Sequence, residues 1–387
     1  MPVPFVRHAG VAARAVWGDG ALAALDGELR RLGITRPVAI CARSVAARAD
    51  VMDMLHEALG DRPVATFSDV REHSPLPQVR AAAEVLAESG ADGVIAVGGG
   101  SAVVTARAAT ILAAERKDIR ELATHRDAEG RMISPRLLAP KLPNVVLATT
   151  PTTAYAKAGA AVRDPEAAER LALFDPKARA QLVVFDPMLA RTAPASLVSS
   201  ASLNMFAMAI DGMQTTADNP LAEALLSQGL REVLASLPAL DADGGDDRER
   251  VRLMLAALLV GQGSDFAGTG IAQALSHAVG PISTTANGVV EAMLLPHTAR
   301  FNRDVTGRSQ ARIAEDFPAG TPDARDLPDA IGRFLASSGV PTRLRDVGIT
   351  QDQLPDAVAH TLGDWSITRV PKPAGEAELL DILQAAW

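Results

Sequence analysis

An apolar run that ends in three consecutive glycines is the strongest chemical signal in this sequence of 387 residues. Residues 92–101 read Asp-Gly-Val-Ile-Ala-Val-Gly-Gly-Gly-Ser, which predicts a strand, a tight turn and then a helix over 102–114. Glycine permits positive φ and close backbone approach, and a helix N-terminus attracts anions, so the segment suits a nucleotide pyrophosphate. The spacing differs from G-x-G-x-x-G, which leaves an ordinary tight turn as the alternative. The expected phosphate-binding residues, the last of which would also cap the helix, are Gly98, Gly99, Gly100 and Ser101.

A second polar segment follows another apolar run, Val145-Val-Leu-Ala-Thr149, which predicts a further strand. Open α/β sheets bind ligands just outside the carboxyl ends of their strands. We therefore expect this segment to reach the same ligand as the glycine turn. Its candidate cofactor-binding residues are Thr149, Thr152 and Thr153.

The only tyrosine of the chain, Tyr155, lies two residues before Lys157. In an extended segment the two side chains would share one face. The lysine charge would then lower the pKa of the phenol, so that Tyr155 could transfer a proton at the reacting centre. Two alternatives stay open: the ring packs and the lysine is solvated, or the ring fills space that a cofactor would need.

The elements that must position these groups alternate between strand and helix in the first half of the chain, which predicts a mostly parallel sheet covered by helices. After about Pro194 the apolar spacing is three and four, which predicts helices only. We therefore expect an α/β domain over residues 1–190 and an all-helical domain over 191–387. The expected strands are Val38–Ala42, Val64–Phe67, Gly93–Val97, Val145–Thr149 and Leu182–Phe185, and the clearest helices are Leu221–Leu237, Arg250–Val260 and Ala330–Ala336.

The composition narrows the function classes. A formal net charge of −8 provides no basic field for nucleic acid, although a local phosphate site needs only N–H groups and one or two cations. No apolar stretch approaches the roughly 20 residues of a membrane span, so we expect no membrane association. The single cysteine, Cys41, excludes an internal disulfide framework and fits a reducing cytoplasm.

Several motifs, in order along the chain, resemble the iron-containing (group III) alcohol dehydrogenase family, on the side of its maleylacetate reductases. The resemblance implies a Rossmann-like, mostly parallel α/β domain and an all-α domain, as in the dehydroquinate synthase-like architecture. It also implies a homodimer, a nicotinamide cofactor and a small-molecule substrate in the cleft between the domains. The motifs are Phe67–Pro77, the glycine turn, Val145–Thr153, Phe185–Pro187, Asn219-Pro-Leu-Ala-Glu-Ala, Leu294-Leu-Pro-His297 with Phe301-Asn302, and Gly339–Gly348.

The family usually holds a divalent metal with one aspartate and three histidines, but the matching positions here carry other residues. Amide and thioether groups are weak, neutral donors to iron(II) or zinc, so we expect no catalytic metal. The replacements would instead bind the substrate or form a satisfied polar core. These four positions are Asn204, Met208, Gln273 and Asn287.

His277 matches a histidine that the family keeps beside its metal, and it would shuttle a proton or form a hydrogen-bonded core histidine. Arg43 follows the first clear strand, where relatives that prefer NAD often carry an aspartate. An arginine there would pair with a 2′-phosphate, which favours NADP over NAD unless Arg43 is simply a surface cation.

Together these residues favour a cytoplasmic, metal-independent NAD(P)H-dependent reductase or dehydrogenase acting on a small polar carbonyl or a conjugated enone-type substrate. Tyr155, Lys157 and His277 are its candidate catalytic residues. The alternative is a nucleotide- or substrate-binding homologue that has lost dehydrogenase activity, or that catalyses a non-redox reaction in the same cleft.

Overall fold

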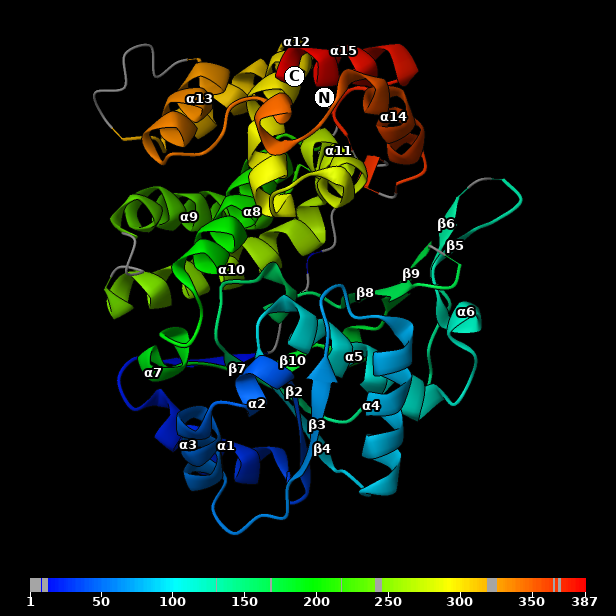
Figure 1. Cartoon of the computed structure of the whole chain (residues 1–387), viewed down its shortest axis with the longest axis vertical. Coiled ribbons are helices and arrows are strands. Elements are labelled where there is room, and N and C mark those ends of the chain that lie inside the picture. Colours follow the sequence, from blue (N-terminus) through cyan, green and yellow to red (C-terminus); the bar gives the residue numbers. More distant parts are fainter. Residues whose placement is uncertain are drawn as a thin grey trace. The chain divides into compact units, whose positions relative to one another are not determined.

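The structure is a computed structural model that describes residues 8, 13–129, 131–167, 169–216, 218–240, 246–318, 326–364, 366–367 and 370–387. These residues form two compact units, one within Val11–Ala193 and one within Pro194–Trp387, to which His8 also belongs. The division falls close to the domain boundary expected after residue 190. Figure 1 labels helices and strands of both units.

The α/β unit is organised around a sheet of six strands in the order β1-β10-β7-β4-β2-β3. All neighbouring pairs are parallel, which confirms the expected α/β class. The central strands are mostly apolar and largely buried because helices cover both of their faces. In sheet order the strands are β1 (Arg14–Trp17), β10 (Ala180–Phe185), β7 (Asn144–Ala148), β4 (Gly93–Gly98), β2 (Pro37–Ala42) and β3 (Ala65–Val70).

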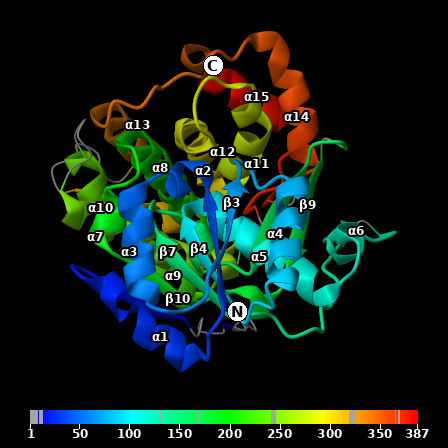
Figure 2. The ribbon, with the colours of Figure 1, turned by 60° about the horizontal axis from the view of Figure 1, so that its bottom comes forward.

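Helices lie on both sides of this sheet (Figure 2). On one side, alternate strand residues such as Ala39 and Cys41 share a buried cluster with α1 (Leu25–Leu32) and α3 (Ala49–Leu59). On the other side lie α4 (Leu76–Glu88) and α5 (Gly100–Glu115). The short helical segments of the unit are η1 (Ala21–Ala24), α2 (Arg43–Ala46), α6 (Ile119–Leu122), η2 (Thr153–Tyr155), η3 (Pro176–Ala178) and α7 (Pro187–Ala190).

Two antiparallel hairpins, which sequence patterning did not predict, lie outside the sheet. They are β5 (His125–Arg126) with β6 (Met132–Ile133) and β8 (Gly159–Asp164) with β9 (Glu169–Phe174). Apolar residues of the second hairpin pack against α5, so this helix is covered on two sides.

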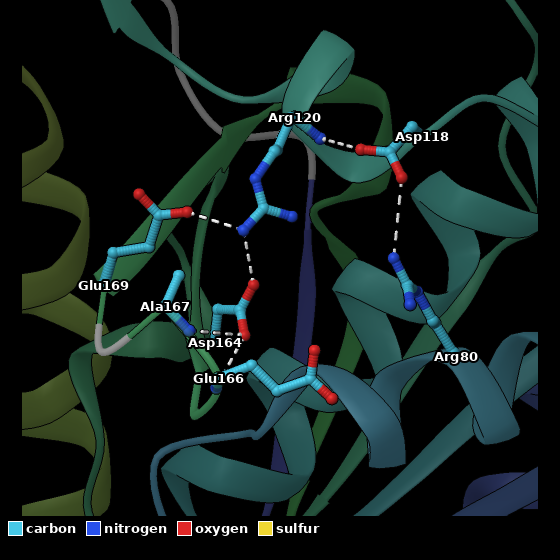
Figure 3. A network of polar contacts seen from close by, with 7 residues as sticks. All are labelled: Arg80, Asp118, Arg120, Asp164, Glu166, Ala167 and Glu169. Atoms are coloured by element: carbon cyan, nitrogen blue, oxygen red, sulfur yellow. Dashed lines mark hydrogen bonds and ion pairs between the residues drawn. The ribbon is translucent and has the colours of Figure 1, made fainter.

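The turn between β8 and β9 is fixed by charge, as Figure 3 shows. Asp164 accepts hydrogen bonds from the backbone N–H of Glu166 at 3.0 Å and from Arg120 of α6 at 2.6 Å. Arg120 also pairs with Glu169 at 2.8 Å. The Arg120 guanidinium holds the pKa of the Asp164 carboxyl below its usual value, so this anchor keeps its charge at neutral pH.

The second unit is helical, and the described residues from Pro194 onward contain no strand, as the sequence predicts. No described helix has both the length and the apolar character to cross a membrane. The helices of eight residues or more are α8 (Ala195–Met213), α9 (Pro220–Ser236), α10 (Asp247–Ala267), α11 (Ile271–Val279), α12 (Asn287–Ala314), α13 (Leu327–Ser337), α14 (Leu354–Leu362) and α15 (Glu376–Ala386).

Helices α8 and α12 approach each other closely at Gly288. A Cβ atom built on Gly288 would lie 2.1 Å from the carbonyl oxygen of Ser200 and 3.1 Å from Cβ of Asn204. Gly307, farther along α12, has no heavy atom within 4 Å of the same constructed position. The absence of a side chain at Gly288 is therefore what allows the two backbones to meet.

We expect Gly288→Ala to destabilise the protein by about 1–3 kcal/mol because the added methyl group overlaps the backbone of α8. Gly307→Ala is the matched control, and it should be neutral or stabilise by up to ~1 kcal/mol because alanine favours a helix interior. Urea unfolding of both variants measures the difference. Equal stabilities for the two variants would contradict the close contact.

Candidate active site

The glycine turn joins β4 to α5 as the sequence predicts, but only Gly98 has positive φ, at 145°. Gly99 has φ −98°, and Gly100 begins the helix. The positive φ that glycine permits is therefore used at one of the three positions. The other two glycines leave room for neighbouring threonines: a Cβ on Gly99 would lie 2.2 Å from Thr150 Oγ1, and one on Gly100 would lie 3.2 Å from Thr152 Oγ1.

The predicted threonines do lie beside this turn. The backbone N–H of Thr149 donates to the carbonyl of Gly98 at 3.2 Å, which joins the ends of β4 and β7. Thr152 accepts a hydrogen bond from the N–H of Ala154 through its hydroxyl at 3.2 Å, and Thr153 is buried. The carboxyl ends of two neighbouring strands thus present glycine backbone and threonine hydroxyls together.

Helix α5 begins at Gly100, two residues earlier than expected, and its N-cap residue is Gly99. No side chain caps this end, so the prediction that Ser101 caps the helix is wrong: Ser101 lies inside the first turn. The first N–H groups of a helix need partners that the helix cannot supply. This 16-residue helix therefore directs unbonded donors and a positive dipole end toward the glycine turn.

Sequence reasoning missed the segment that supports this helix end. His73 and Ser74 have φ of 61° and 47°, a conformation that non-glycine residues seldom adopt. Ser74 is buried and donates from its hydroxyl to the carbonyl of Ser101 at 3.2 Å. The sequence signal was present, because the segment lies within one of the resemblance motifs, but no spacing rule identifies its contact.

Arg43 begins the short helix α2 directly after β2, where the cofactor prediction placed it. Its guanidinium pairs with Asp69 of β3 at 2.9 Å, and its side chain is 74% exposed. Arg71 pairs with the same carboxylate at 3.2 Å. Two cations and one anion thus meet at the carboxyl ends of β2 and β3, which leaves a local excess of positive charge.

Tyr155 is buried in the α/β unit instead of standing at an open centre. Its hydroxyl donates to the carbonyl of Thr150, and its ring meets Phe185 edge-on with centroids 5.4 Å apart. Burial raises the pKa of the phenol above its usual value, the opposite of the expected activation. This arrangement favours the packing role that the sequence left open.

The expected extended Tyr-x-Lys arrangement is also absent. Tyr155 ends the 3-10 turn η2, and Ala156 has φ −98° and ψ −19°, which is helical and not extended. Lys157 is half-buried. The two side chains therefore lack the shared strand face on which the predicted proton transfer depended.

In the helical unit, Asn204 of α8 donates from Nδ2 to Glu291 Oε2 of α12 at 2.5 Å. Glu291 has no exposed surface. Met208, one turn after Asn204, is buried, and Asn287, one turn before Glu291, is half-buried. Asn204 thus lies at a contact between α8 and α12, beside a buried carboxyl group that sequence reasoning did not single out. Met208 and Asn287 lie one turn away along the two helices.

Gln273, the fourth predicted substrate-binding residue, lies in the first turn of α11, close to the buried Asp211 of α8. The backbone N–H groups of Gly270, Ala272 and Gln273 favour the ionised form of the Asp211 carboxyl and so act to lower its pKa. Burial nevertheless raises the pKa of Asp211 to about 7. Gly270 has to be glycine here, because a Cβ atom would lie 2.4 Å from Asp211 Cγ.

His277 lies one turn after Gln273 and pairs through Nδ1 with Asp364 Oδ2 at 2.8 Å. Ser366, two residues after Asp364, donates from its hydroxyl to Gln273 Oε1 at 3.4 Å. His277 and Gln273 are therefore joined by one polar segment that follows α14. Neither Asp364 nor Ser366 carried a sequence signal.

These residues do not fit a catalytic iron or zinc ion. The four matched positions offer amides and a thioether, and the described residues contain no group of three or more His, Cys, Asp or Glu arranged to hold a metal. The nicotinamide prediction fits better, since an uncapped helix end behind a glycine turn suits a pyrophosphate.

Each of the two units matches a family model of known proteins. Residues 12–187 match the family model "Iron-containing alcohol dehydrogenase", and residues 198–387 match "Fe-containing alcohol dehydrogenase family, C-terminal". The chain belongs to the iron-containing alcohol dehydrogenase family, whose members are NAD(P)-dependent alcohol or aldehyde dehydrogenases and reductases.

Individual relatives match over nearly the whole chain. The chain is 29% identical to a 4-hydroxybutyrate dehydrogenase of Cupriavidus necator over 94% of this chain and 96% of that protein. It is 23% identical to maleylacetate reductase 1 of Cupriavidus pinatubonensis over 88% of this chain and 86% of the relative. Among solved structures, sulfoacetaldehyde reductase from Bifidobacterium kashiwanohense in complex with NAD+ has a TM-score of 0.85, 19% identity and 99% coverage of both chains.

We expect Tyr155→Phe to lower the free energy of unfolding by about 1–3 kcal/mol, because the buried Thr150 carbonyl would lose its donor. Turnover should remain close to that of the parent. Urea unfolding and initial-rate kinetics on the same preparation test both expectations. A hundredfold loss of turnover at parent stability would instead restore Tyr155 to the mechanism.

Proposed function

We propose that this chain is an NAD(P)H-dependent reductase or dehydrogenase that acts on a small polar carbonyl or conjugated enone-type substrate. The observation that carries the proposal is the uncapped N-terminus of α5 directly behind the Gly98–Gly100 turn. Such an end stabilises a pyrophosphate through N–H groups and the helix dipole, without any basic side chain. Family membership supports the choice of a nicotinamide cofactor.

We assign the phosphates to Gly98, Gly99, Gly100 and Ser101, with Thr149, Thr152 and Thr153 beside them. Arg43 supports a preference for NADP, because a guanidinium pairs well with a 2′-phosphate. Asp69 competes for this cation, and Arg71 on the same carboxylate provides a second one. The expected preference for NADP over NAD is therefore modest.

We assign the substrate to the helical unit, where Asn204, Gln273 and Asn287 offer amide groups near Met208. Amide donors can orient a carbonyl or carboxylate oxygen without a metal ion. The bound nicotinamide would supply or accept the hydride. His277 would deliver a proton to the oxygen of the reduced carbonyl, or remove one in the reverse direction. Tyr155 and Lys157 receive no step, because the geometry around Tyr155 favours packing.

The remaining parts of the proposal concern assembly and location. A homodimer follows from the family resemblance. A reducing cytoplasm suits the single buried cysteine, Cys41.

The cofactor assignment predicts that Ser101→Asp weakens NADPH binding by roughly tenfold or more, because a carboxylate in the first turn of α5 repels the pyrophosphate. The same charge favours the helix dipole, so the fold should persist. Ser101→Asn is the matched neutral control and should keep most of the NADPH affinity, because its amide adds no charge and can still donate to a phosphate. Fluorescence titration with NADPH and NADH measures the affinities. Failure of the parent to bind either cofactor would favour the homologue without dehydrogenase activity.

Amides and a thioether at the four positions that match the family's metal ligands are weak donors to iron(II) or zinc. We therefore expect well under one divalent metal ion per chain in protein purified without chelators. Turnover of a carbonyl substrate with NADPH should then be unchanged after incubation with EDTA. Elemental analysis and initial rates check the two statements. Stoichiometric iron or zinc, together with loss of turnover on chelation and recovery on adding the metal back, would overturn the metal-independent assignment.

A further inference from the structure

The pairing of His277 with Asp364 has a geometry that restricts the histidine ring. Nδ1 of His277 lies 2.8 Å from Oδ2 of Asp364, and the two side chains are 16% and 14% exposed. Nε2, the other ring nitrogen, forms no hydrogen bond with any part of the chain that the structure describes. One nitrogen is thus held by a carboxylate, and the side chain that carries the other is mostly but not completely buried.

Hydrogen bonds hold both the backbone and the side chain of Asp364. Its backbone N–H donates to the carbonyl of Thr361 at 3.0 Å, and its Oδ1 accepts the N–H of Ser366 at 2.7 Å. Burial alone would raise the pKa of Asp364, but the hydrogen bond and charge of His277, with the Ser366 N–H, outweigh burial and lower it. The partner of Nδ1 is therefore an ionised carboxylate held in one orientation.

An ionised carboxylate only accepts hydrogen bonds, so Nδ1 of the paired ring has to carry a proton. In the neutral imidazole this places the lone pair on Nε2, and in the imidazolium it places the transferable proton there. The carboxylate therefore selects the tautomer as well as the ring orientation. The same selection governs other histidine–carboxylate pairs in enzymes.

We propose that Asp364 is a positioning residue that holds His277 as the Nδ1–H tautomer, so that Nε2 is the atom that exchanges a proton with the substrate. This inference rests on the proposed reductase function. It adds Asp364 as a positioning residue and Nε2 of His277 as the atom that transfers the proton. Gln273 extends the arrangement, because Ser366 joins it to Asp364. The substrate-binding amide and the proton-transfer group thus depend on the same short segment.

The proton balance follows from this tautomer. In reduction a bound nicotinamide would supply a hydride to the carbonyl carbon, and the oxygen would receive the Nε2 proton of the imidazolium. The ring would be left neutral with its remaining proton on Nδ1, against Asp364, and would take up one proton from the solvent at Nε2. In oxidation the neutral Nε2 would accept the hydroxyl proton, and the oxidised nicotinamide would accept the hydride from the carbon.

The first experiment measures the tautomer without any substrate. Nitrogen-15 spectra of histidine-labelled protein, recorded at a pH where the ring is neutral, should show the Nδ1–H form for His277. The signal is assigned by its absence from His277→Gln. In Asp364→Asn the amide can donate to Nδ1, so the ring should shift toward the Nε2–H form. Asp356→Asn, an exposed aspartate on α14, is the matched control and should leave the signal unchanged.

The second experiment links the tautomer to turnover. We expect Asp364→Asn to lower kcat by at least roughly a hundredfold, with KM and NADPH affinity changed by less than about threefold. Asp364→Glu should restore part of kcat, since a carboxylate returns to Nδ1. Asp356→Asn should keep the parent kcat, and thermal unfolding of each variant shows whether it is folded.

The outcomes separate this inference from the proposed function. An Nε2–H tautomer in the parent, or an unchanged kcat in folded Asp364→Asn, overturns the positioning role. A kcat loss that Asp364→Glu does not relieve, accompanied by a matching loss of stability, overturns it as well. A parent protein that shows the Nδ1–H form but reduces no carbonyl compound contradicts the proposed function and leaves the tautomer assignment intact.

Discussion

The helical unit has to accommodate a buried carboxylate, and much of its local arrangement follows from that constraint. Glu291 has no exposed surface, and the amide of Asn204 reaches it at 2.5 Å. A buried charge is costly unless hydrogen-bonded groups surround it. The close approach of α12 to α8 at Gly288 brings the two side chains within reach. The same contact between α8 and α12 therefore determines both how these helices pack and which polar groups lie at Asn204, a predicted substrate-binding residue.

Family membership leaves open the chemistry of the four positions where relatives usually hold a metal. Both halves of the chain match the iron-containing alcohol dehydrogenases, and the fold agrees with them. The groups available at the four matched positions are nevertheless amides and a thioether, which favour hydrogen bonds over metal coordination. A fold can keep its cofactor-binding end while the chemistry of its other end changes, because different elements supply the two.

The sequence predicted those features that depend on local pattern. The five expected strands correspond to β2, β3, β4, β7 and β10, because each is a short apolar run between turn signals. The hairpin β8–β9 was missed, since its stability comes from packing on α5 and from the Arg120 pairings. Glu291 and Asp364 were missed for a related reason: each lies 87 residues from its partner, and no periodicity connects positions so far apart. The role of Tyr155 likewise depended on a tertiary contact with the Thr150 carbonyl.

The order of strands in the sheet has a consequence for how the chain is made. Among the strands that the structure describes, the first of this sheet, β1, pairs with the last, β10, and Arg14 lies opposite Leu182. A ribosome therefore releases the amino-terminal strand long before its neighbour exists. Closing so large a loop is entropically costly, and contacts of long sequence separation form slowly. The sheet of the α/β unit can therefore be completed only after almost all of that unit has been synthesised. Strand β1 stays without its neighbour β10 for most of that time.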